Sequence, residues 1–414
     1  MINPKHTPEL KQHFNDLEEK TYKELMGDIP DDHPSFIKEN VNKNRYLTVA
    51  PAIETLITKP VYVNANFITI DQKKYIATQA PLPHTISDFY EMIYAYSSRI
   101  VMLTKIMEEN KRFNPTKIRQ KADQYWPEAG EIQEYGRFYV FNRAQKILVA
   151  EINKKQLFMA PKDMFASPDE FKMYCMRVGE KHGVIKSNTV DIRQEFERMS
   201  SPQPSSQQTQ QRALLASPLS EKMPTLDIPV ADQYLESVKS WRSPKQEVEQ
   251  PMLDSDKCAC IKQVVHFEYD SWLDTLHPSN IQSFHLLISL AMENLSEPLT
   301  VHCSAGVGRT GMFIGCCSYY LQKKVLSKLI KSSLSSDRSI SSGTSSKFSV
   351  ENVLDEWQRR CDSQIRKELI LDVDKLVFSM RKQRDWQCVQ TMDQYQGMFE
   401  YIFYLYAWRQ AGGK

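Results

Sequence analysis

The sequence contains no apolar stretch that approaches the ~18 residues needed to span a bilayer. Its first residues, Met1–Leu10, are polar and include two prolines, a composition that excludes a signal peptide. Position 2 is isoleucine and not glycine, which excludes N-terminal myristoylation. These absences predict a cytoplasmic protein without a membrane span.

The chain also lacks an excess of charge of either sign. Its 53 Lys and Arg residues nearly balance its 51 Asp and Glu residues, so the net charge of +2 gives no reason to expect nucleic acid as a partner. The local basic run Arg381–Arg384 is interpreted as a solvated helix face, which is the usual context of such runs.

Cysteines are few and scattered. None of the eight forms a Cys-x-x-Cys pair, so the sequence predicts no structural zinc site. In a reducing compartment these thiols are expected to be free. Seven of them resemble small hydrophobic or surface residues, and Cys303 is the exception.

Helical and strand patterns alternate along the chain. Apolar residues recur at helical spacing in residues 9–26, 85–96 and 312–321. Short runs typical of strands occur at 99–103, 137–141, 146–152 and 264–269. This mixture predicts an α/β fold, in which one domain contains a twisted mixed sheet flanked by helices on both faces.

Two segments interrupt the pattern. Residues 200–250 are rich in Ser, Pro and Gln, and residues 326–349 are rich in Ser. Neither carries enough periodic apolar residues to offset the entropy of ordering it. We predict that both are disordered insertions in a single domain of residues 1–414, whose core covers about 20–410. Linkers between two domains are the alternative, but matching motifs fall on both sides of each segment.

The segment from Val301 to Gly311 carries the chemistry. It follows a short apolar strand and precedes a helical run, and it contains glycines in the loop between them. Such a loop turns successive backbone N–H groups around an anion, and the helix dipole adds positive potential there. A helix N-terminus and a nearby cation favour the thiolate form of cysteine, so Cys303 is predicted to be a nucleophile. A lone cysteine is more often a packing residue, but that interpretation does not account for the glycines, the helix and Arg309.

At these residues the sequence resembles the cysteine-dependent protein tyrosine phosphatases, whose signature matches every position from His302 to Gly311. Further motifs similar to those of the family follow in the same order along nearly the whole chain. They are Lys43–Tyr46, Tyr62–Asn66, Thr78–Pro83, Gln124–Pro127 and Gln390–Tyr395. The resemblance implies hydrolysis of phosphotyrosine in partner proteins through a cysteinyl-phosphate intermediate, without metal or cofactor.

The resemblance also implies catalytic roles. Arg309 would hold the phosphate, and Thr310 would offer a hydroxyl to the departing sulfur. Asp274 would be the general acid of the first step and the base of the second. Gln390 would position the hydrolytic water. An Asp274 that only caps a turn is the alternative, and Asp270 would then be another candidate acid.

Other residues would bind the substrate or support the catalytic groups. The tyrosine ring of the substrate would pack against Tyr46. The phosphate would be surrounded by Ser304, Ala305, Gly306, Val307, Gly308, Arg309 and Gln394. Lys121 would approach Asp274, Glu108 would brace Arg309, and His302 would support the loop.

Three positions depart from the family pattern. Leu273 replaces the proline before the acid, and Thr48 stands where most members have an aspartate that grips the substrate backbone. After the acid, Thr275–Pro278 replaces the usual His-Gly-Val-Pro. Loss of proline and glycine changes the stiffness and hinge of this loop. Similar loosened motifs occur in the tyrosine phosphatases encoded by polydnaviruses, and membership of that group would place the protein in the host cell cytoplasm.

Two alternatives to a working tyrosine phosphatase are open. The first is a pseudophosphatase that binds phosphotyrosine as a substrate trap and has lost useful turnover. The working enzyme is favoured because all four expected catalytic residues are retained together: Cys303, Arg309, Asp274 and Gln390. The second is dual specificity toward phosphoserine and phosphothreonine, which the Tyr46 loop disfavours because it should deepen the pocket.

Overall fold

The structure is a computed structural model that describes residues 8–27, 30, 32–109, 118–181, 254–322 and 363–410. Apart from residues 254 and 255, these belong to one compact unit. The predicted insertions at 200–250 and 326–349 lie outside the described residues.

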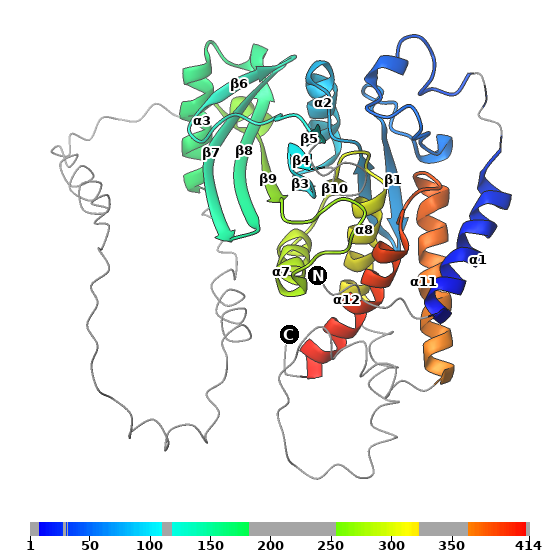
Figure 1. Ribbon diagram of the computed structural model, residues 1–414. Coiled ribbons are helices and arrows are strands. Elements are labelled where there is room, and N and C mark those ends of the chain that lie inside the picture. Colours follow the sequence, from blue (N-terminus) through cyan, green and yellow to red (C-terminus); the bar gives the residue numbers. More distant parts are fainter. Residues whose placement is uncertain are drawn as a thin grey trace, which may run out of the picture. The chain divides into compact units, whose positions relative to one another are not determined.

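Within these ranges, eight strands form a mixed sheet in the order β1-β2-β10-β3-β9-β8-β7-β6 (Figure 1). The strands are β1 (Ala65–Ile70), β2 (Lys73–Thr78), β3 (Arg99–Met102), β6 (Ile132–Tyr135), β7 (Phe138–Val149), β8 (Ile152–Pro161), β9 (Lys262–Tyr269) and β10 (Leu299–His302). The central strand β10 is parallel to β2 and β3, and β3 is parallel to β9. The outer pairs are antiparallel. A separate hairpin joins β4 (Met107–Glu109) to β5 (Ile118–Gln120). The predicted α/β fold with a mixed sheet is confirmed.

Helices cover both faces of the sheet. They are α1 (Pro8–Leu25), α2 (Ile86–Tyr96), α3 (Pro168–Lys181), α6 (Ser255–Cys260), α7 (Ile281–Met292), α8 (Gly308–Leu321), α11 (Ser363–Gln383) and α12 (Met392–Gln410). On one face, Phe89 and Ile93 of α2 belong to the same buried hydrophobic cluster as Ile100 of β3 and Val140 of β7. The opposite face of the sheet is covered by α7 and α8, which contact β9 and β10. None of the helices in the described ranges has the length and apolar character of a membrane span.

The antiparallel half of the sheet differs from its prediction. The runs at 137–141 and 146–152 were expected to be two strands, but β7 continues from Phe138 to Val149. Its register against β8 shifts between Asn142 and Ala144 and again near Ile147. A bulge inserts a residue and reverses the inward and outward alternation, so a continuous strand loses the period of two that identifies it in a sequence.

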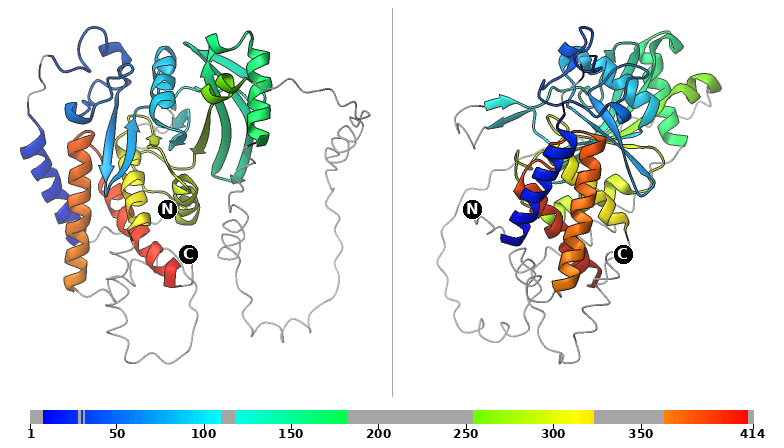
Figure 2. Two further views of the ribbon diagram at one scale, coloured as in Figure 1. Left: turned by 180° about the vertical axis from the view of Figure 1, so that it is seen from behind. Right: turned by 90° about the vertical axis from the view of Figure 1, so that its right-hand side faces the viewer.

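The N-terminal helix belongs to the core. Leu10, Phe14 and Leu17 of α1 are buried, and α1 packs beside α11 (Figures 1 and 2). The core therefore includes residues before the predicted boundary near residue 20.

A buried arginine fastens α1 to the rest of the molecule. Arg381 of α11 donates to the Thr21 hydroxyl at 2.7 Å, contacts the Glu18 carboxylate, and donates to the carbonyl oxygens of Cys388 and Val389. Arg381 and Arg384 are both buried, so the interpretation of the run 381–384 as a solvated helix face is wrong. Helical spacing places both arginines on the face turned toward the core.

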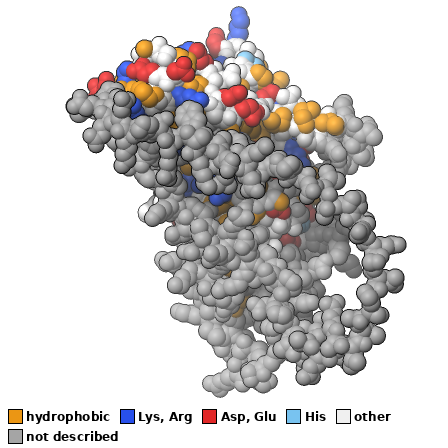
Figure 3. Space-filling model, turned by 90° about the vertical axis from the view of Figure 1, so that its left-hand side faces the viewer, with side chains coloured by type: hydrophobic (Ala, Val, Ile, Leu, Met, Phe, Trp, Pro, Cys, Tyr) orange, Lys and Arg blue, Asp and Glu red, His pale blue; other side chains and the backbone are white. Residues whose placement is uncertain are grey.

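Charges of both signs are mixed on the surface that can be inspected. On the described part of the face in Figure 3, Lys and Arg side chains alternate with Asp and Glu side chains. No basic patch dominates that part, in agreement with the small net charge.

We predict that Arg381→Ala lowers the free energy of unfolding by about 3 kcal/mol, because it leaves two carbonyl oxygens and a buried hydroxyl without their donor. The matched control is Lys382→Ala, which removes the neighbouring cation, whose side chain is 52% exposed. Urea unfolding of both variants measures the difference. Equal, small losses would show that Arg381 does not fasten α1.

Candidate active site

The candidate site lies where β10 ends and α8 begins. Cys303 follows the last residue of β10 and is buried, and α8 starts at Gly308. Because β10 is hydrogen bonded to parallel neighbours on both sides, its carboxyl end is fixed within the parallel part of the sheet. The carboxyl edge of a parallel sheet is where α/β proteins bind ligands.

The carbonyl groups of the loop are held on its outer side. Ala80 N–H donates to the carbonyl of Ser304 at 2.9 Å. Arg384 donates through Nη2 to the carbonyl of Ala305 and through Nε to that of Gly306, each at 3.1 Å. With its carbonyls held outward, the loop turns its N–H groups inward and forms an anion cradle. We call residues 303–309 the cradle.

Gly306 permits the sharpest bend of the cradle. Its φ of +73° lies in the left-handed region. A Cβ at this position would lie 2.2 Å from the carbonyl oxygen of Thr78. Only glycine fits there, because the cradle is pressed against the end of β2.

Arg309 projects a buried guanidinium that interacts electrostatically with Cys303. Its Nη1 donates to Glu108 Oε1 at 2.5 Å and to the carbonyl oxygen of Trp272 at 2.8 Å. Its Nε and Nη2 make no hydrogen bond within the described part of the chain, although Nη2 lies 3.4 Å from Asp274 Oδ1. The Nη1 group of the guanidinium is therefore anchored by protein acceptors. Its Nε and Nη2 groups form the opposite edge, whose two donors are spaced to bind two oxygens of a phosphate.

Glu108 and Lys121 lie where the resemblance implied. Glu108 is buried, bonds Arg309, and also accepts from the Thr104 hydroxyl at 2.8 Å. Lys121 Nζ lies 2.6 Å from Asp274 Oδ2. The hairpin β4–β5 and the segment after it thus bring both groups to the cradle.

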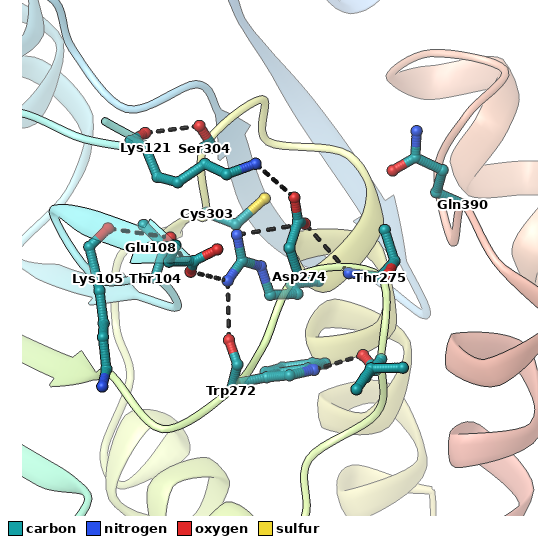
Figure 4. Close-up of polar contacts among 12 residues, drawn as sticks. Thr104, Lys105, Glu108, Lys121, Trp272, Asp274, Thr275, Cys303, Ser304 and Gln390 are labelled. Atoms are coloured by element: carbon teal, nitrogen blue, oxygen red, sulfur yellow. Dashed lines mark hydrogen bonds and ion pairs between the residues drawn. The ribbon is translucent and has the colours of Figure 1, made fainter. Parts of the chain in front are cut away.

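Asp274 is held between two cations (Figure 4). Burial raises the pKa of this carboxyl, but Arg309 and Lys121 together lower it more, so the pKa of Asp274 lies below its usual range. In this state of the site, Asp274 is ionised at neutral pH.

The loop that carries Asp274 is tied down at several points. We call residues 272–278 the acid loop. The indole N–H of Trp272 donates to the carbonyl of Leu276 at 2.6 Å, and Thr391 Oγ1 donates to the carbonyl of Thr275 at 2.7 Å. Thr275 has a φ of +67°, which is unusual for a β-branched residue and costs about 1–3 kcal/mol. These contacts hold the loop beside Arg309, although Leu273 stands where the resemblance implies a proline.

Tyr46 lies beside the cradle at Ser304. Its hydroxyl hydrogen bonds Ser304 Oγ at 2.8 Å, and Ser304 Oγ donates to the carbonyl of Lys121 at 2.6 Å. Since Ser304 uses its proton for that carbonyl, Tyr46 is the donor to Ser304. The next residues, Leu47 and Thr48, are exposed.

The two glutamines take different positions. Gln394 is buried, its Nε2 has no hydrogen-bond partner among the described residues, and a Cβ on Gly308 would lie 3.0 Å from that atom. Gln390 is exposed and donates to Gln387 Oε1 at 2.9 Å, so its side chain is turned away from Cys303 (Figure 4). The buried hydroxyl of Thr310 also has no hydrogen-bond partner within the described ranges.

A buried chain of hydrogen bonds supports the cradle from below. His302 Nδ1 lies 3.0 Å from the carbonyl of Cys303, and its Nε2 lies 2.6 Å from the hydroxyl of Tyr125, which lies 2.8 Å from His266 Nε2. Burial lowers the pKa of His302 to about 4, so the ring is neutral. Because a carbonyl only accepts, His302 carries its proton on Nδ1, Tyr125 donates to His302, and His266 donates to Tyr125.

Three supporting groups were not found from the sequence. Arg384 was assigned to a solvent-exposed run, and the roles of Tyr125 and His266 in orienting His302 were not recognised. Tyr125 lies within the motif Gln124–Pro127, which was the available signal. Among the described residues, no cluster of three or more His, Cys, Asp or Glu side chains is arranged to hold a metal ion.

Comparison with known proteins agrees with this geometry. The sequence profile described as Protein-tyrosine phosphatase matches residues 40–211 and 236–331. Tyrosine-protein phosphatase 3 of Dictyostelium discoideum is 38% identical over 135 residues, which are 30% of this chain and 13% of that protein. Tyrosine-protein phosphatase 1 of Caenorhabditis elegans is 39% identical over 113 residues, 24% of this chain and 10% of that protein. The matches thus cover only a small part of the length of these relatives.

The fold is shared with a solved structure. The crystal structure of the catalytic domain of human protein tyrosine phosphatase non-receptor type 18 is similar with a TM-score of 0.53 at 20% identity. The alignment covers 96% of this chain and 96% of that chain. At this identity, the likeness shows a shared fold.

We predict that Gly306→Ala destroys the cradle, because the added Cβ meets the backbone of Thr78. Affinity for inorganic phosphate should fall by about tenfold or more, since small misplacements of positioned donors are costly. Gly130→Ala is the matched control, because Gly130 also has a positive φ of +87° but nothing within 4 Å of an added Cβ. The control should cost only about 1 kcal/mol of stability and leave phosphate binding unchanged. Calorimetric titration with phosphate measures both, and equal affinities would refute the assigned role of Gly306.

Proposed function

Because the chain belongs to the protein-tyrosine phosphatase family, we propose that it hydrolyses phosphotyrosine in proteins through a cysteinyl-phosphate intermediate. The observation that carries the proposal is the buried guanidinium of Arg309, which has two unbonded N–H donors beside the Cys303 thiol and the inward-turned cradle. This arrangement suits a phosphate monoester dianion whose phosphorus atom is attacked by the sulfur of Cys303.

In the first step, the Cys303 thiolate attacks phosphorus and forms an S–P bond, while the bond from phosphorus to the tyrosine oxygen breaks. Arg309 and the cradle N–H groups stabilise the equatorial oxygens. Asp274 gives its proton to the departing phenolate. The proton therefore moves from Asp274 to tyrosine, and the phosphoryl group moves to sulfur.

In the second step, water attacks phosphorus and the S–P bond breaks. Asp274 accepts the proton of the water, and the Thr310 hydroxyl donates a hydrogen bond to the departing thiolate. Gln394 is already buried beside Gly308, with a free amide N–H group to orient the water. Gln390 joins it by exchanging its contact with Gln387 for one in the cradle.

Substrate binding places Asp274 in its working protonation state. In the described site, Arg309 and Lys121 keep the pKa of Asp274 below its usual range even though burial raises it. A bound phosphate dianion engages Arg309 and adds negative charge next to Asp274, and both effects raise the pKa of that carboxyl. Substrate binding thus favours the protonated form of Asp274, which is the form that the first step requires.

The substrate class follows from Tyr46 and its neighbours. The half-buried ring of Tyr46, hydrogen bonded to Ser304, provides a wall for the phenyl ring of phosphotyrosine. A solved structure titled as non-receptor type 18 phosphatase in complex with HER2 phosphopeptides has the same fold, with a TM-score of 0.51. Thr48 lacks the carboxylate that would bind substrate N–H groups, so peptide affinity is weaker. Turnover of phosphoserine peptides as fast as phosphotyrosine peptides would contradict tyrosine specificity.

Two finer assignments accompany the proposal. The nucleophilic thiol and the free cysteines of the described residues suit a reducing compartment, which supports a cytoplasmic location. Leu273 and Thr48 support membership of the polydnavirus-encoded group, which acts in the host cell cytoplasm. Recovery of the protein in a membrane or secreted fraction, or grouping of its sequence with cellular phosphatases in a phylogeny, would contradict these assignments.

We predict that Cys303→Ser abolishes hydrolysis of p-nitrophenyl phosphate and retains binding of a phosphotyrosyl peptide, because a serine hydroxyl is not ionised at neutral pH. Cys258→Ser, on α6, is the control and should leave both properties unchanged. Steady-state kinetics and calorimetry measure them. Residual turnover above a trace in Cys303→Ser would exclude Cys303 as the nucleophile. A wild-type protein that binds the peptide without turnover would be the pseudophosphatase.

We predict that Asp274→Asn lowers kcat by ~10²–10⁴-fold while KM changes far less. The loss should be larger for phenyl phosphate than for p-nitrophenyl phosphate, because the better leaving group departs without a proton. In the wild type, kcat should fall as pH rises through the pKa of Asp274 in the complex, and this limb should vanish in Asp274→Asn. An equal loss for both substrates would indicate a structural role or another acid such as Asp270.

A further inference from the structure

The end of the acid loop is attached to α12 by one side chain. His277 follows Asp274 by three positions in the sequence. Its backbone N–H donates to Asp393 Oδ2 at 2.6 Å, and its ring Nδ1 lies 2.7 Å from the same oxygen. The other ring nitrogen, Nε2, lies 3.5 Å from Glu400 Oε2. Both ring nitrogens therefore face carboxylates of a single helix.

Close packing holds this contact in register. A Cβ added at Gly397 of α12 would lie 2.6 Å from Cβ of His277 and 2.6 Å from Cε of Met312. The acid loop therefore lies directly on the α12 backbone, between Asp393 and Glu400. The His277 side chain is 22% exposed, and that of Glu400 is 5% exposed.

The surroundings favour the charged form of the ring. Burial lowers the pKa of His277, but Asp393 and Glu400 raise it more, and the pKa lies above its usual value. The charged groups facing His277 from α12 are these two carboxylates, and from α8 the neighbour is the apolar Met312. Within the acid loop, the carboxylate of Asp274 is already bound by Lys121 and Arg309.

The same part of the chain carries the two glutamines of the site. Asp393 lies between Gln390 and Gln394, and Thr391 Oγ1 donates to the carbonyl of Thr275 at 2.7 Å. The acid loop is thus attached to the start of α12 at two places, one on each side of Leu276. Its position over Cys303 depends on both attachments.

We propose that His277 is a positioning residue for the general acid: in its imidazolium form it clamps the acid loop to both Asp393 and Glu400, and its deprotonation removes the ion pair with Glu400 and loosens the loop. The inference rests on the proposed function, because it assigns a part to the loop that carries Asp274. The clamp requires two ring donors, which a histidine has in its imidazolium form. Valine, the residue usual in the family at this position, has no donor in its side chain and cannot form the clamp.

The sign of the pH effect follows from the direction of the shift. A raised pKa of His277 means that the clamp is complete below the ordinary histidine range and is lost as pH rises through the raised value. The acid loop should therefore become less ordered on the alkaline side, and acid catalysis should weaken over the same interval.

The test uses the full chain and two readouts. The first is the pH profile of kcat and KM for phenyl and p-nitrophenyl phosphate. The second is the indole N–H resonance of Trp272, assigned with Trp272→Phe, which reports the loop because this group donates to the carbonyl of Leu276. In the wild type, the resonance should shift over the pH interval in which His277 titrates.

Three variants separate the outcomes. His277→Gln should lower kcat for phenyl phosphate by about tenfold at low pH, a part of the ~10²–10⁴-fold supplied by general acids, with a smaller loss for p-nitrophenyl phosphate. The Trp272 resonance should no longer titrate with His277. Glu400→Gln removes one negative partner and should move the midpoint to lower pH. His13→Gln is the matched control, because His13 faces Asp374 at 3.3 Å on α1 and α11, and it should change neither readout.

The inference would be overturned if His277→Gln lowered kcat equally for both substrates and left the Trp272 titration as in the wild type. If His277→Gln fails to fold, the midpoint shift in Glu400→Gln decides, and an unchanged midpoint overturns the inference. A wild-type protein that turns over neither substrate, but whose Trp272 resonance titrates only when His277 is present, would support the clamp and refute the proposed activity.

Discussion

The site is organised around one buried positive charge. Arg309 has a guanidinium without solvent access, so its charge must be balanced inside the protein. Glu108 is the buried carboxylate that pairs with Arg309 at 2.5 Å. Asp274 lies farther away, at 3.4 Å, and is the partner that a bound anion can displace. Burial lowers the pKa of Arg309, but Asp274, Cys303 and Glu108 raise it more, so the arginine remains charged. The hairpin, the acid loop and the cradle all meet at this side chain.

This shared partner links substrate binding, loop position and acid strength. In the described site, Arg309 holds the acid loop through the carbonyl of Trp272 and the carboxylate of Asp274. In the proposed reaction, a phosphate dianion would replace Asp274 as the partner of the guanidinium edge, while the bond to the carbonyl of Trp272, which uses Nη1, would be retained. The loop can therefore stay closed while the carboxyl is freed to take up a proton, which is the form that the chemistry requires.

The sequence was informative for site residues that are neighbours in the chain. It was less informative for residues that only the fold brings to the site. Cys303 to Arg309 lie within a few positions of one another, so their loop and helix could be recognised directly. Arg384 donates to the backbone carbonyls of Ala305 and Gly306. Because every residue type has a backbone carbonyl, no sequence pattern identifies the partners of Arg384. The strand β7 was divided in the prediction because bulges disturb its alternation. The turned-out rotamer of Gln390 depends on a local contact with Gln387 that composition does not specify.

The acid loop shows how a missing proline can be compensated. Proline restricts a loop by limiting its backbone in the unfolded and open states. With Leu273 in that position, restriction has to come from contacts made in the closed state, and the structure has them at Trp272, Thr275 and His277. The left-handed backbone of Thr275 is unfavourable and offsets part of the stabilisation that these contacts provide. Because these contributions oppose one another, the loss of one charge at His277 is, under the proposed clamp, the kind of change that would shift the position of the loop.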